Sequence, residues 1–161
     1  DETGEVADLL VEPTPDPQEV TPLPENAEVG TVDPLTVFAD LGRSVSEGRG
    51  CSGTYAVFDG KRRYDLKISD RGEKILKPTS YSVFSGPALA CHVAWDMKGG
   101  ERREKNKYSR TARDRTVYVA APFEGAEPIP VGMTIETDYG TLMAHLTSVE
   151  AGGQRLAVPT D

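Results

Sequence analysis

The sequence predicts a mainly β fold: an antiparallel curled sheet with one short amphipathic helix. Apolar residues recur at helical spacing between residues 34 and 47, and from Cys51 onward they alternate with polar residues instead. About seven strands joined mostly by short turns favour a half-barrel, a barrel, a β-spiral or a sandwich. A chain of 161 residues is long enough to bury a core of its own.

The first part of the chain differs from the rest in charge. Residues 1–33 contain ten acidic residues and neither Lys nor Arg, so the remaining 18 basic and 16 acidic residues leave a net charge of +2. The formal net charge of -8 therefore belongs to the acidic segment and is a poor guide to the partners of the folded part.

The same segment is rich in proline, with five prolines between Pro13 and Pro24. This composition predicts an acidic proline-rich extended segment over residues 1–32, followed by an antiparallel β domain over residues 33–161. The extended segment is either a flexible linker or an ordered strap. The residues that would anchor a strap are Val11, Val20 and Leu23.

One helix is signalled at residues 34–47. Asp33 suits its N-cap, Pro34 the first helical position and Gly48 the stop. An apolar stripe at helical spacing predicts the face that packs against the sheet. It consists of Leu35, Phe38, Leu41 and Val45.

The first hairpin follows from the Asp59-Gly60 pair, a strong two-residue turn signal. A turn at this point pairs Val57 with Arg62, Tyr55 with Tyr64, Gly53 with Leu66, and Cys51 with Ile68. The return strand alternates apolar and polar residues, so one face of the hairpin is apolar and the other is polar and exposed to solvent. Cys51 is expected on the apolar face.

Further strands follow along the chain. A less regular strand over residues 73–84 is interrupted by Pro78, and the next strand places Cys91 on an apolar face with Trp95. After a polar loop over residues 98–115, strands are predicted at residues 116–123, 129–137, 141–149 and 154–158. A turn at Tyr139-Gly140 would place Ile135 opposite Ala144 and Met133 opposite Leu146.

The two cysteines stand 40 positions apart and are too few for a metal site. They are either reactive thiols or a disulfide, and the disulfide is favoured because Cys51 and Cys91 both point inward from different strands. Closing a loop of this length stabilises a fold by roughly 4 kcal/mol in the chain-entropy treatment. A disulfide implies a periplasmic or otherwise exported protein, since the cytosol keeps thiols reduced.

Catalytic signatures are absent from the sequence. His92 and His145 each alternate with apolar neighbours and are interpreted as ordinary residues on the polar faces of their strands. No GxSxG, P-loop or GxGxxG motif occurs. We therefore expect no enzyme, no catalytic residue, no metal site and no cofactor.

A basic segment over residues 98–115 carries eight basic and three acidic residues, a net charge of +5. It is either a solvated loop or a contact for anionic lipid headgroups, polysaccharide, nucleic acid or the acidic N-terminal segment. Only Tyr108 offers a base-stacking ring, so no nucleic acid partner is expected. The candidate contacts are Arg102, Arg103, Lys105, Lys107 and Arg110.

Three aromatic residues share the predicted apolar face, namely Tyr55, Tyr64 and Trp95. They either fill a core or, if the sheet curls around an unfilled space, line a cavity for an apolar or lipid-like ligand. The sequence leaves both readings open.

The chain holds no run of the roughly 20 apolar residues that a membrane-spanning helix needs. It begins at Asp1 with no initiator methionine and no signal peptide. We expect a processed product, a recombinant product or a fragment, with any signal peptide already removed.

Three stretches together resemble a known family: VDPLTVFADL, CSGTYAVFDGKRRYDLKISD and YSVFSGPALACHV. The chain from about Glu12 to Val149 is similar to the domain of unknown function 3108 family of proteobacterial envelope proteins. The resemblance implies an envelope location, an export signal and the Cys51–Cys91 bridge. It also implies N-terminal strands missing from this chain, which would then be the C-terminal portion of a longer curled protein.

Two functions are consistent with these observations. The first is a non-catalytic periplasmic protein that binds an apolar or lipid-like ligand in the curled sheet. The second is a structural or protein-interaction module that supports envelope integrity, with a filled core and no ligand. The expected partners are accordingly a lipid, an envelope protein, or the missing strands of the same protein.

Overall fold

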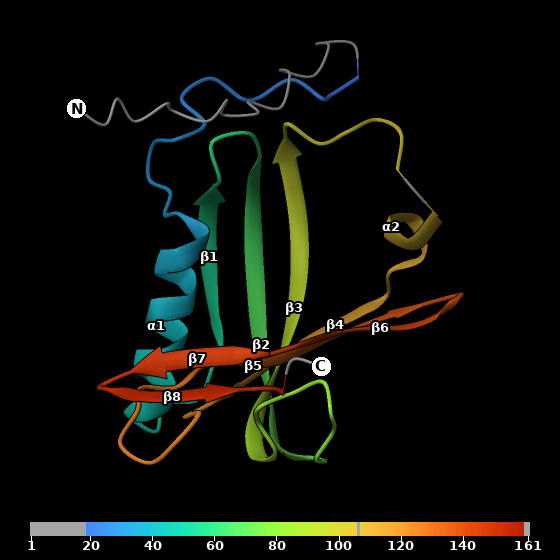
Figure 1. The fold of residues 1–161 in the computed structure, drawn as a ribbon. Coiled ribbons are helices and arrows are strands. Elements are labelled where there is room, and N and C mark those ends of the chain that lie inside the picture. Colours follow the sequence, from blue (N-terminus) through green and yellow to red (C-terminus); the bar gives the residue numbers. More distant parts are fainter. Residues whose placement is uncertain (1–18, 106, 160–161) are drawn as a thin grey trace, which may run out of the picture.

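The computed structural model describes residues 19–105 and 107–159 and confirms the predicted fold class. Six strands form one antiparallel sheet in the order β1-β2-β3-β4-β5-β6, so each strand lies beside its neighbours in sequence (Figure 1). These strands are β1 (Gly53–Phe58), β2 (Arg63–Leu76), β3 (Gly86–Gly99), β4 (Asp114–Ala120), β5 (Ile129–Thr137) and β6 (Gly140–His145). A separate two-stranded sheet consists of β7 (Ser148–Ala151) and β8 (Gln154–Ala157).

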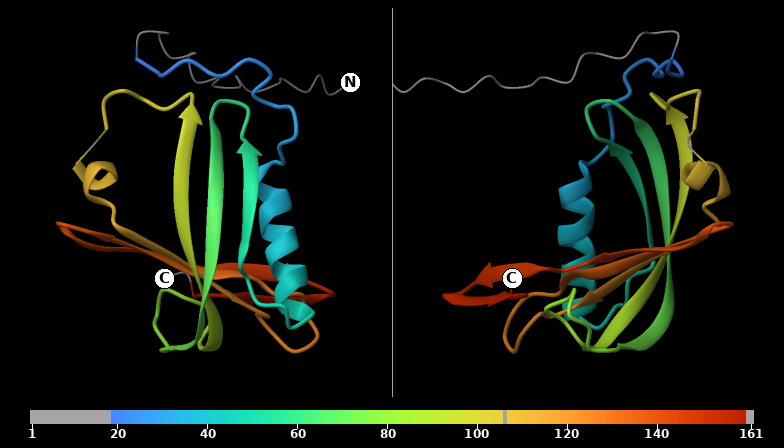
Figure 2. Two further views of the ribbon diagram at one scale, coloured as in Figure 1. Left: turned by 180° about the vertical axis from the view of Figure 1, so that it is seen from behind. Right: turned by 45° about the vertical axis from the view of Figure 1, so that its right-hand side comes forward.

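The six-stranded sheet is curled and open. Strands β1–β3 run together, and β4–β6 cross them at a steep angle (Figures 1 and 2). The backbones of β3 and β4 pair only from Leu89–Val119 to His92–Thr116, and beyond His92 the two strands separate. Within the described ranges β1 and β6 do not pair with each other, so the curl does not close into a barrel.

The helix α1 (Pro34–Ser46) lies on the concave side of this sheet (Figure 2). Its N-terminus is capped by Asp33, whose Oδ1 accepts hydrogen bonds from the N–H groups of Leu35 at 2.8 Å and Thr36 at 3.1 Å. The predicted helix is therefore present and starts at Pro34. The main core fills the space between α1 and the strands, and its buried members are Val37, Leu41, Cys51, Val57, Leu66, Ile68, Cys91, Val93, Val117 and Val119.

The core-facing stripe of α1 agrees with the predicted one at Leu41 and Val45 and differs from it at Leu35 and Phe38. Val37, Leu41 and Gly42 are buried, whereas Leu35 is 77% exposed. A β-carbon at Gly42 would stand 2.2 Å from the carbonyl oxygen of Pro128, so only glycine lets the helix approach the chain this closely. The helix thus meets the rest of the chain most closely at Gly42, next to the buried Leu41, whereas Leu35 near its start faces solvent.

The disulfide between Cys51 and Cys91 is present, and both residues are fully buried. Their Cα atoms lie 6.1 Å apart. Cys91 stands opposite Asp70 of β2, and the Asp70 carboxylate accepts a hydrogen bond from the Cys51 N–H at 3.3 Å. The bridge thus ties the residues before β1 to β3, across β2.

Both predicted hairpin registers are wrong by two positions, although the predicted faces hold. Val57 pairs with Tyr64 and not with Arg62. The Asp59 carboxylate accepts hydrogen bonds from the N–H groups of Lys61 at 3.0 Å and Arg62 at 2.7 Å, which makes a four-residue loop instead of a two-residue turn. Because side chains alternate with period two, a shift of two keeps every side chain on its face.

The last hairpin of the large sheet is corrected in the same way. Met133 pairs with Ala144 and not with Leu146. The Thr137 hydroxyl donates a hydrogen bond to the carbonyl of Gly140 at 2.7 Å, so the loop closes earlier than expected. The predicted strand over residues 141–149 is divided into β6 and β7.

The predicted separate strand over residues 73–84 is correct as a strand only up to Leu76. Residues Glu73 to Leu76 continue β2 after a bulge, where Gly72 has a φ of 81° and its N–H donates to the Asp70 carboxylate at 2.7 Å. Residues 77–85 form a loop. A second short helix, α2 (Lys107–Thr111), lies within the predicted polar loop.

A second, smaller core lies on the convex side of the sheet, where the sequence predicts polar faces. The loop over residues 77–85 covers it, held by a hydrogen bond from the Val83 N–H to the Leu146 carbonyl at 2.8 Å. Strand β4 is therefore buried on both faces. The continuous apolar run over residues 117–121 is typical of such a strand. The buried members are Phe84, Ala88, Ala90, Tyr118, Ala120 and Val131.

The N-terminal part of the described chain lies across one end of β1–β3 as a strap over residues 19–32 (Figure 1). Val20 pairs with Arg102, and the Arg103 N–H donates to the Glu19 carbonyl at 2.8 Å. Val32 pairs in parallel with Val57 and covers part of the outer edge of β1. The proposed anchor Val11 lies outside the described residues.

In the ranges that the structure describes, neither helix has the length and apolar character needed to cross a lipid bilayer.

Candidate functional site

The concave side carries an aromatic and cationic row at the point where β3 and β4 separate. The rings of Tyr64 and Trp95 meet edge to face with centroids 6.4 Å apart. Arg115 is the third member of this row, and its guanidinium lies over the Trp95 ring, 4.9 Å from the ring centroid. Trp95 is nevertheless 49% exposed, so neither side chain covers it.

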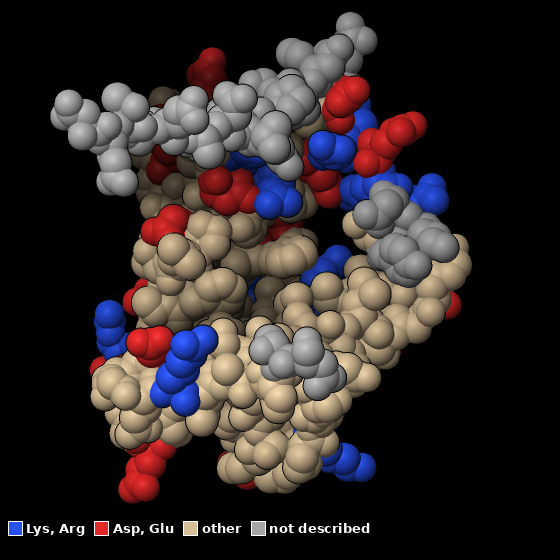
Figure 3. All heavy atoms as spheres, viewed as in Figure 1, with Lys and Arg blue, Asp and Glu red and all other residues tan. Residues whose placement is uncertain are grey.

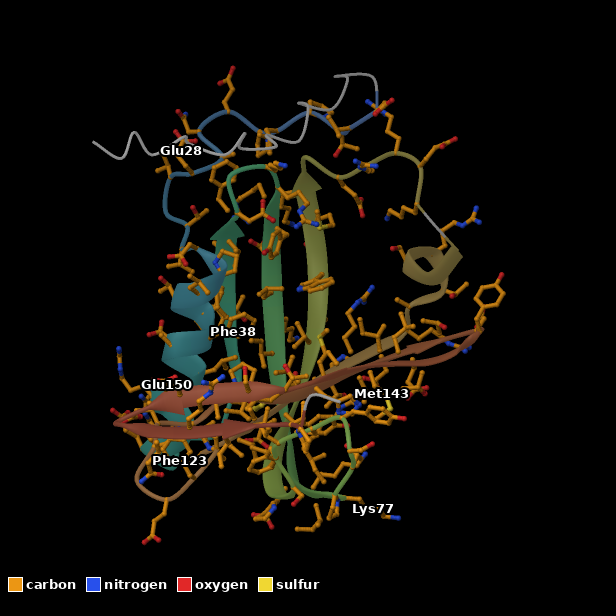
Figure 4. The ribbon with its side chains drawn as sticks, viewed as in Figure 1. Glu28, Phe38, Lys77, Phe123, Met143 and Glu150 are labelled. Carbon is orange, nitrogen blue, oxygen red and sulfur yellow. A yellow bond between two sulfur atoms is a disulfide. The ribbon has the colours of Figure 1, made fainter. Side chains whose placement is uncertain are left out.

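The helix supplies a second apolar wall. Phe38 stands one turn before Gly42 on the same stripe of α1, and Gly42 touches the chain at Pro128, just before β5. Phe38 therefore faces the side on which β5 passes, and it remains 42% exposed. Figure 4 shows Phe38 on α1 beside the strands β1–β3.

Strand β6 supplies a third wall. Leu142 pairs with Ile135, which pairs with Arg115, so all three side chains share the concave side. Leu142 is 44% exposed. Its neighbour Met143 is 62% exposed and points to the opposite side of the sheet (Figure 4).

The surface of the molecule is hollowed between these walls. Figure 3 shows the hollow between the body formed by α1 and β1–β3 and the arm formed by β4–β6, with basic atoms visible inside it. The three walls present Trp95, Phe38 and Leu142 to solvent, each close to half exposed. The concave side is thus filled where α1 packs on the sheet, and open where Trp95 lies.

The two tyrosines of the predicted ligand-facing set are more enclosed than Trp95. The Tyr55 ring lies against Gly53, where a β-carbon would stand 3.2 Å from the ring. Burial raises the pKa of the Tyr55 hydroxyl, and the Asp40 carboxylate acts in the same direction. Burial also raises the pKa of Tyr64, so both hydroxyls are neutral near pH 7.

A separate cavity of about 750 Å³ opens where the C-terminal end of α1 meets the bulge of β2 and the start of β3. Its wall combines apolar Val45 and Leu89 with the acidic Asp70 and Glu73. Leu89 precedes Trp95 by six residues, which is about 20 Å along a strand. The Asp70 carboxylate already accepts hydrogen bonds from backbone groups around the bulge, so this cavity offers an apolar wall but few uncommitted polar groups.

The basic segment lies on the outer surface and is mixed with acidic groups (Figure 3). Arg102, Arg103 and Lys105 are exposed, and the Lys105 ammonium lies 2.7 Å from the Glu101 carboxylate. A depression of about 420 Å³ is lined by Arg103, Glu104, Lys105 and Arg110. Lys107 begins α2, and its side chain is outside the described part.

Both histidines lie on the convex side, away from the aromatic row. His92 Nδ1 lies 2.9 Å from Asp114 Oδ1, and Arg71 donates to Asp114 Oδ2 at 2.7 Å. The pKa of the Asp114 carboxyl is lowered by the hydrogen bond from Arg71 and, in the same direction, by His92. The sequence places no acid beside His92, and only the β3–β4 pairing brings Asp114 to it.

His145 instead lies near the Tyr81 ring, with ring centroids 6.3 Å apart. No cluster of three or more His, Cys, Asp or Glu side chains with metal-binding geometry occurs in the described ranges.

A family model described as "Protein of unknown function (DUF3108)" matches residues 6–147. The chain belongs to the DUF3108 family. The match agrees with the resemblance seen in the sequence and takes in α1 and all six strands of the curled sheet, whereas β7 and β8 lie beyond it. No curated protein and no solved structure matches the chain.

The open concave side therefore belongs to the part that the chain shares with the DUF3108 family. Sequence reasoning identified Trp95 and Tyr64 there, but it assigned Phe38 to a packing face and Arg115 to the basic loop. One feature of the sequence could have placed Arg115 on the concave side. It stands two and four residues before Val117 and Val119, and this spacing places all three side chains on one face of β4.

Proposed function

We propose that this DUF3108 protein is an exported, non-catalytic binding protein that holds the apolar chain of an amphiphile on its concave side. The observation that carries the proposal is the set of half-exposed apolar side chains on three walls of one hollow, Trp95, Phe38 and Leu142. Scattered single apolar residues need no explanation, but residues that converge from a helix and two arms of a sheet favour a binding surface.

The exposed apolar area of these walls favours an apolar occupant. Covering such side chains gains about 25 cal/mol for each Å² removed from water, and an acyl chain can follow a long shallow surface that no compact ligand would fill. The neutral hydroxyls of Tyr55 and Tyr64 fit an apolar occupant, because neither introduces a charge into the hollow. The apolar chain of a lipid-like molecule is therefore the occupant that these walls match best.

Export is supported by the buried Cys51–Cys91 disulfide, since such bonds persist in oxidising compartments. The proposal contains no chemical step. His92 and His145 lie on the convex side, and His92 is held by Asp114, so no imidazole reaches the hollow among the described residues.

A direct test is organic extraction of the protein purified from its native compartment, followed by mass spectrometry. A stoichiometric amphiphile with an alkyl chain is the expected result. Protein that carries no lipid and gains none from mixed vesicles of native lipids would contradict the proposal.

The alternative of a protein-interaction module is favoured by one observation. Strand β6 pairs only with β5 in the part of the chain that the structure describes, and its exposed Met143 lies beside that free edge. A free edge can accept a strand from another protein. Crosslinking from a cysteine introduced at Met143 in native membranes tests this alternative, since capture of a protein at β6 and no lipid in the extract would favour it.

A further inference from the structure

We infer that the head of the bound amphiphile is an anion and that Arg115 binds it. This inference rests on the proposed function, because it names the chemical class of the molecule that occupies the same hollow. The apolar walls select a chain, whereas Arg115 is the one group on the aromatic row that carries a charge.

Arg115 is half-buried on the concave side of β4, in line with the core residues Val117 and Val119. Its guanidinium lies over the Trp95 ring, 4.9 Å from the ring centroid. A guanidinium held over an aromatic face through a cation–π contact can still offer its N–H groups as donors to an anion.

The neighbouring cations have carboxylate partners, and Arg115 has none in the described ranges. Arg71 is paired with Asp114 at 2.7 Å, and Arg113 is paired with Asp138 at 2.7 Å. A half-buried charge that lacks a counter-ion is costly, and an anion brought by a ligand removes this cost. The charge of the hollow is thus complementary to an anionic head.

The chemistry of the guanidinium narrows the head to a carboxylate or a phosphate. Both groups accept two parallel N–H hydrogen bonds from arginine, and a partly apolar surrounding strengthens the attraction. The exposed basic residues Arg102 and Arg103 differ in this respect, because surrounding water and salt weaken the attraction of their charges for an anion. A head at Arg115 places the attached chain against Trp95 and within the three apolar walls.

The test compares three twelve-carbon amphiphiles below their critical micelle concentrations by calorimetric titration: dodecanoate, dodecyl phosphate and dodecyl maltoside. The wild-type protein is expected to bind the two anions about tenfold more tightly than the neutral maltoside, or more. Arg115→Met is expected to lose this preference while it still binds dodecyl maltoside, and Arg115→Lys is expected to keep part of it. Arg113→Met is the matched control, because it removes the same charge from an exposed pair with Asp138.

The outcomes separate the inference from the proposed function. Equal binding of all three amphiphiles by wild type, or an unchanged anion preference in Arg115→Met, overturns the inference and leaves the binding function standing. Failure of wild type to bind any of them overturns both. Thermal unfolding of each variant shows whether it is folded, and Arg115→Lys keeps the test decisive if Arg115→Met does not fold. The stronger of the two anions identifies the head as carboxylate or phosphate.

Discussion

Cys51 is bonded to Cys91 across β2, so one covalent link joins the segment before β1 to the middle of β3. The bond closes a loop over a sequence separation of 40 residues. Replacing both cysteines with alanine is expected to lower the free energy of unfolding by about 4 kcal/mol, because the unfolded chain regains the entropy of that loop. Urea denaturation of the oxidised wild type and of the double variant measures the difference.

Reduced wild type is the control for the packing lost with the two sulfur atoms, since it keeps them but lacks the bond. Two titratable thiols in natively exported protein would contradict the disulfide and the compartment inferred from it. A loss of stability below about 1 kcal/mol would show that the bond does not restrict the unfolded chain as expected.

Gly42 makes a close contact that α1 needs in order to lie on the sheet. Gly42→Ala would raise the stability of an isolated helix by about 1 kcal/mol, since alanine is the better helix former. In this protein its β-carbon would meet the Pro128 carbonyl oxygen at 2.2 Å, a backbone atom that cannot move aside. We expect the opposite sign, a destabilisation of about 1–3 kcal/mol from overpacking, measured by urea denaturation.

Ala39→Ser is a suitable control, because Ala39 lies on the exposed face of the same helix. An increase in stability of Gly42→Ala would mean that α1 does not approach the Pro128 backbone in solution.

The Asp114 carboxylate gives stability a defined pH dependence. Its pKa is lowered in the folded protein by the hydrogen bond from Arg71 and by His92, so its contribution is present above the usual pKa of an aspartate and is lost as the pH falls through the lowered value. Asp114→Asn is expected to be less stable than wild type at pH 7. This difference should shrink as the pH falls below the usual pKa of an aspartate, where the unfolded chain takes up the proton first, and should be lost once the pH passes the lowered pKa of the folded carboxylate.

Unfolding free energies of both proteins between neutral and acidic pH provide the measurement. Asp138→Asn serves as the control, because its pair with Arg113 is largely exposed and contributes little. A stability difference between Asp114→Asn and wild type that is independent of pH would contradict the assigned role of the carboxylate.

The exposed basic segment is expected to contact anionic surfaces. Reversing the charges of Arg102, Arg103 and Lys105 to glutamate should weaken binding to vesicles that contain an anionic phospholipid, because these three side chains project into solvent. Co-sedimentation with vesicles in low salt measures the effect. Reversal of Arg43, Arg49 and Arg155 changes the net charge equally at other sites, and an equal loss of binding there would contradict a local contact.

The fold was largely predictable because its local signals agree with its tertiary contacts. Asp33 and Pro34 start α1 where the sequence places it, and the period of two along the first hairpin and along β3 puts Cys51 and Cys91 on one side. The hairpin registers were not predictable from Asp59-Gly60 alone, since the Asp59 side chain lengthens the loop by its own hydrogen bonds. Because the register error is two residues, each side chain still lies on the face of the sheet that the sequence predicts.

The site was predictable only in part. Trp95 and Tyr64 follow from alternation along their strands, but the half exposure of Trp95 depends on where β4 leaves β3. Phe38 appears as a packing residue in the sequence, and it is left open because Gly42 anchors the helix one turn further on. Arg115 looks like one charge of a basic loop until the β4 pairing fixes it over Trp95.

The most direct test of the proposed binding face uses the fluorescence of Trp95, the only tryptophan in the chain. Titration with dodecyl maltoside below its critical micelle concentration should shift the emission to shorter wavelength and saturate, because the alkyl chain removes water from the half-exposed indole. Leu142→Gln should weaken this binding severalfold, whereas Met143→Gln, a change of similar character on the other face of β6, should leave it intact. An emission spectrum that does not respond in wild type, or an equal loss in both variants, would contradict an amphiphile site on the concave side.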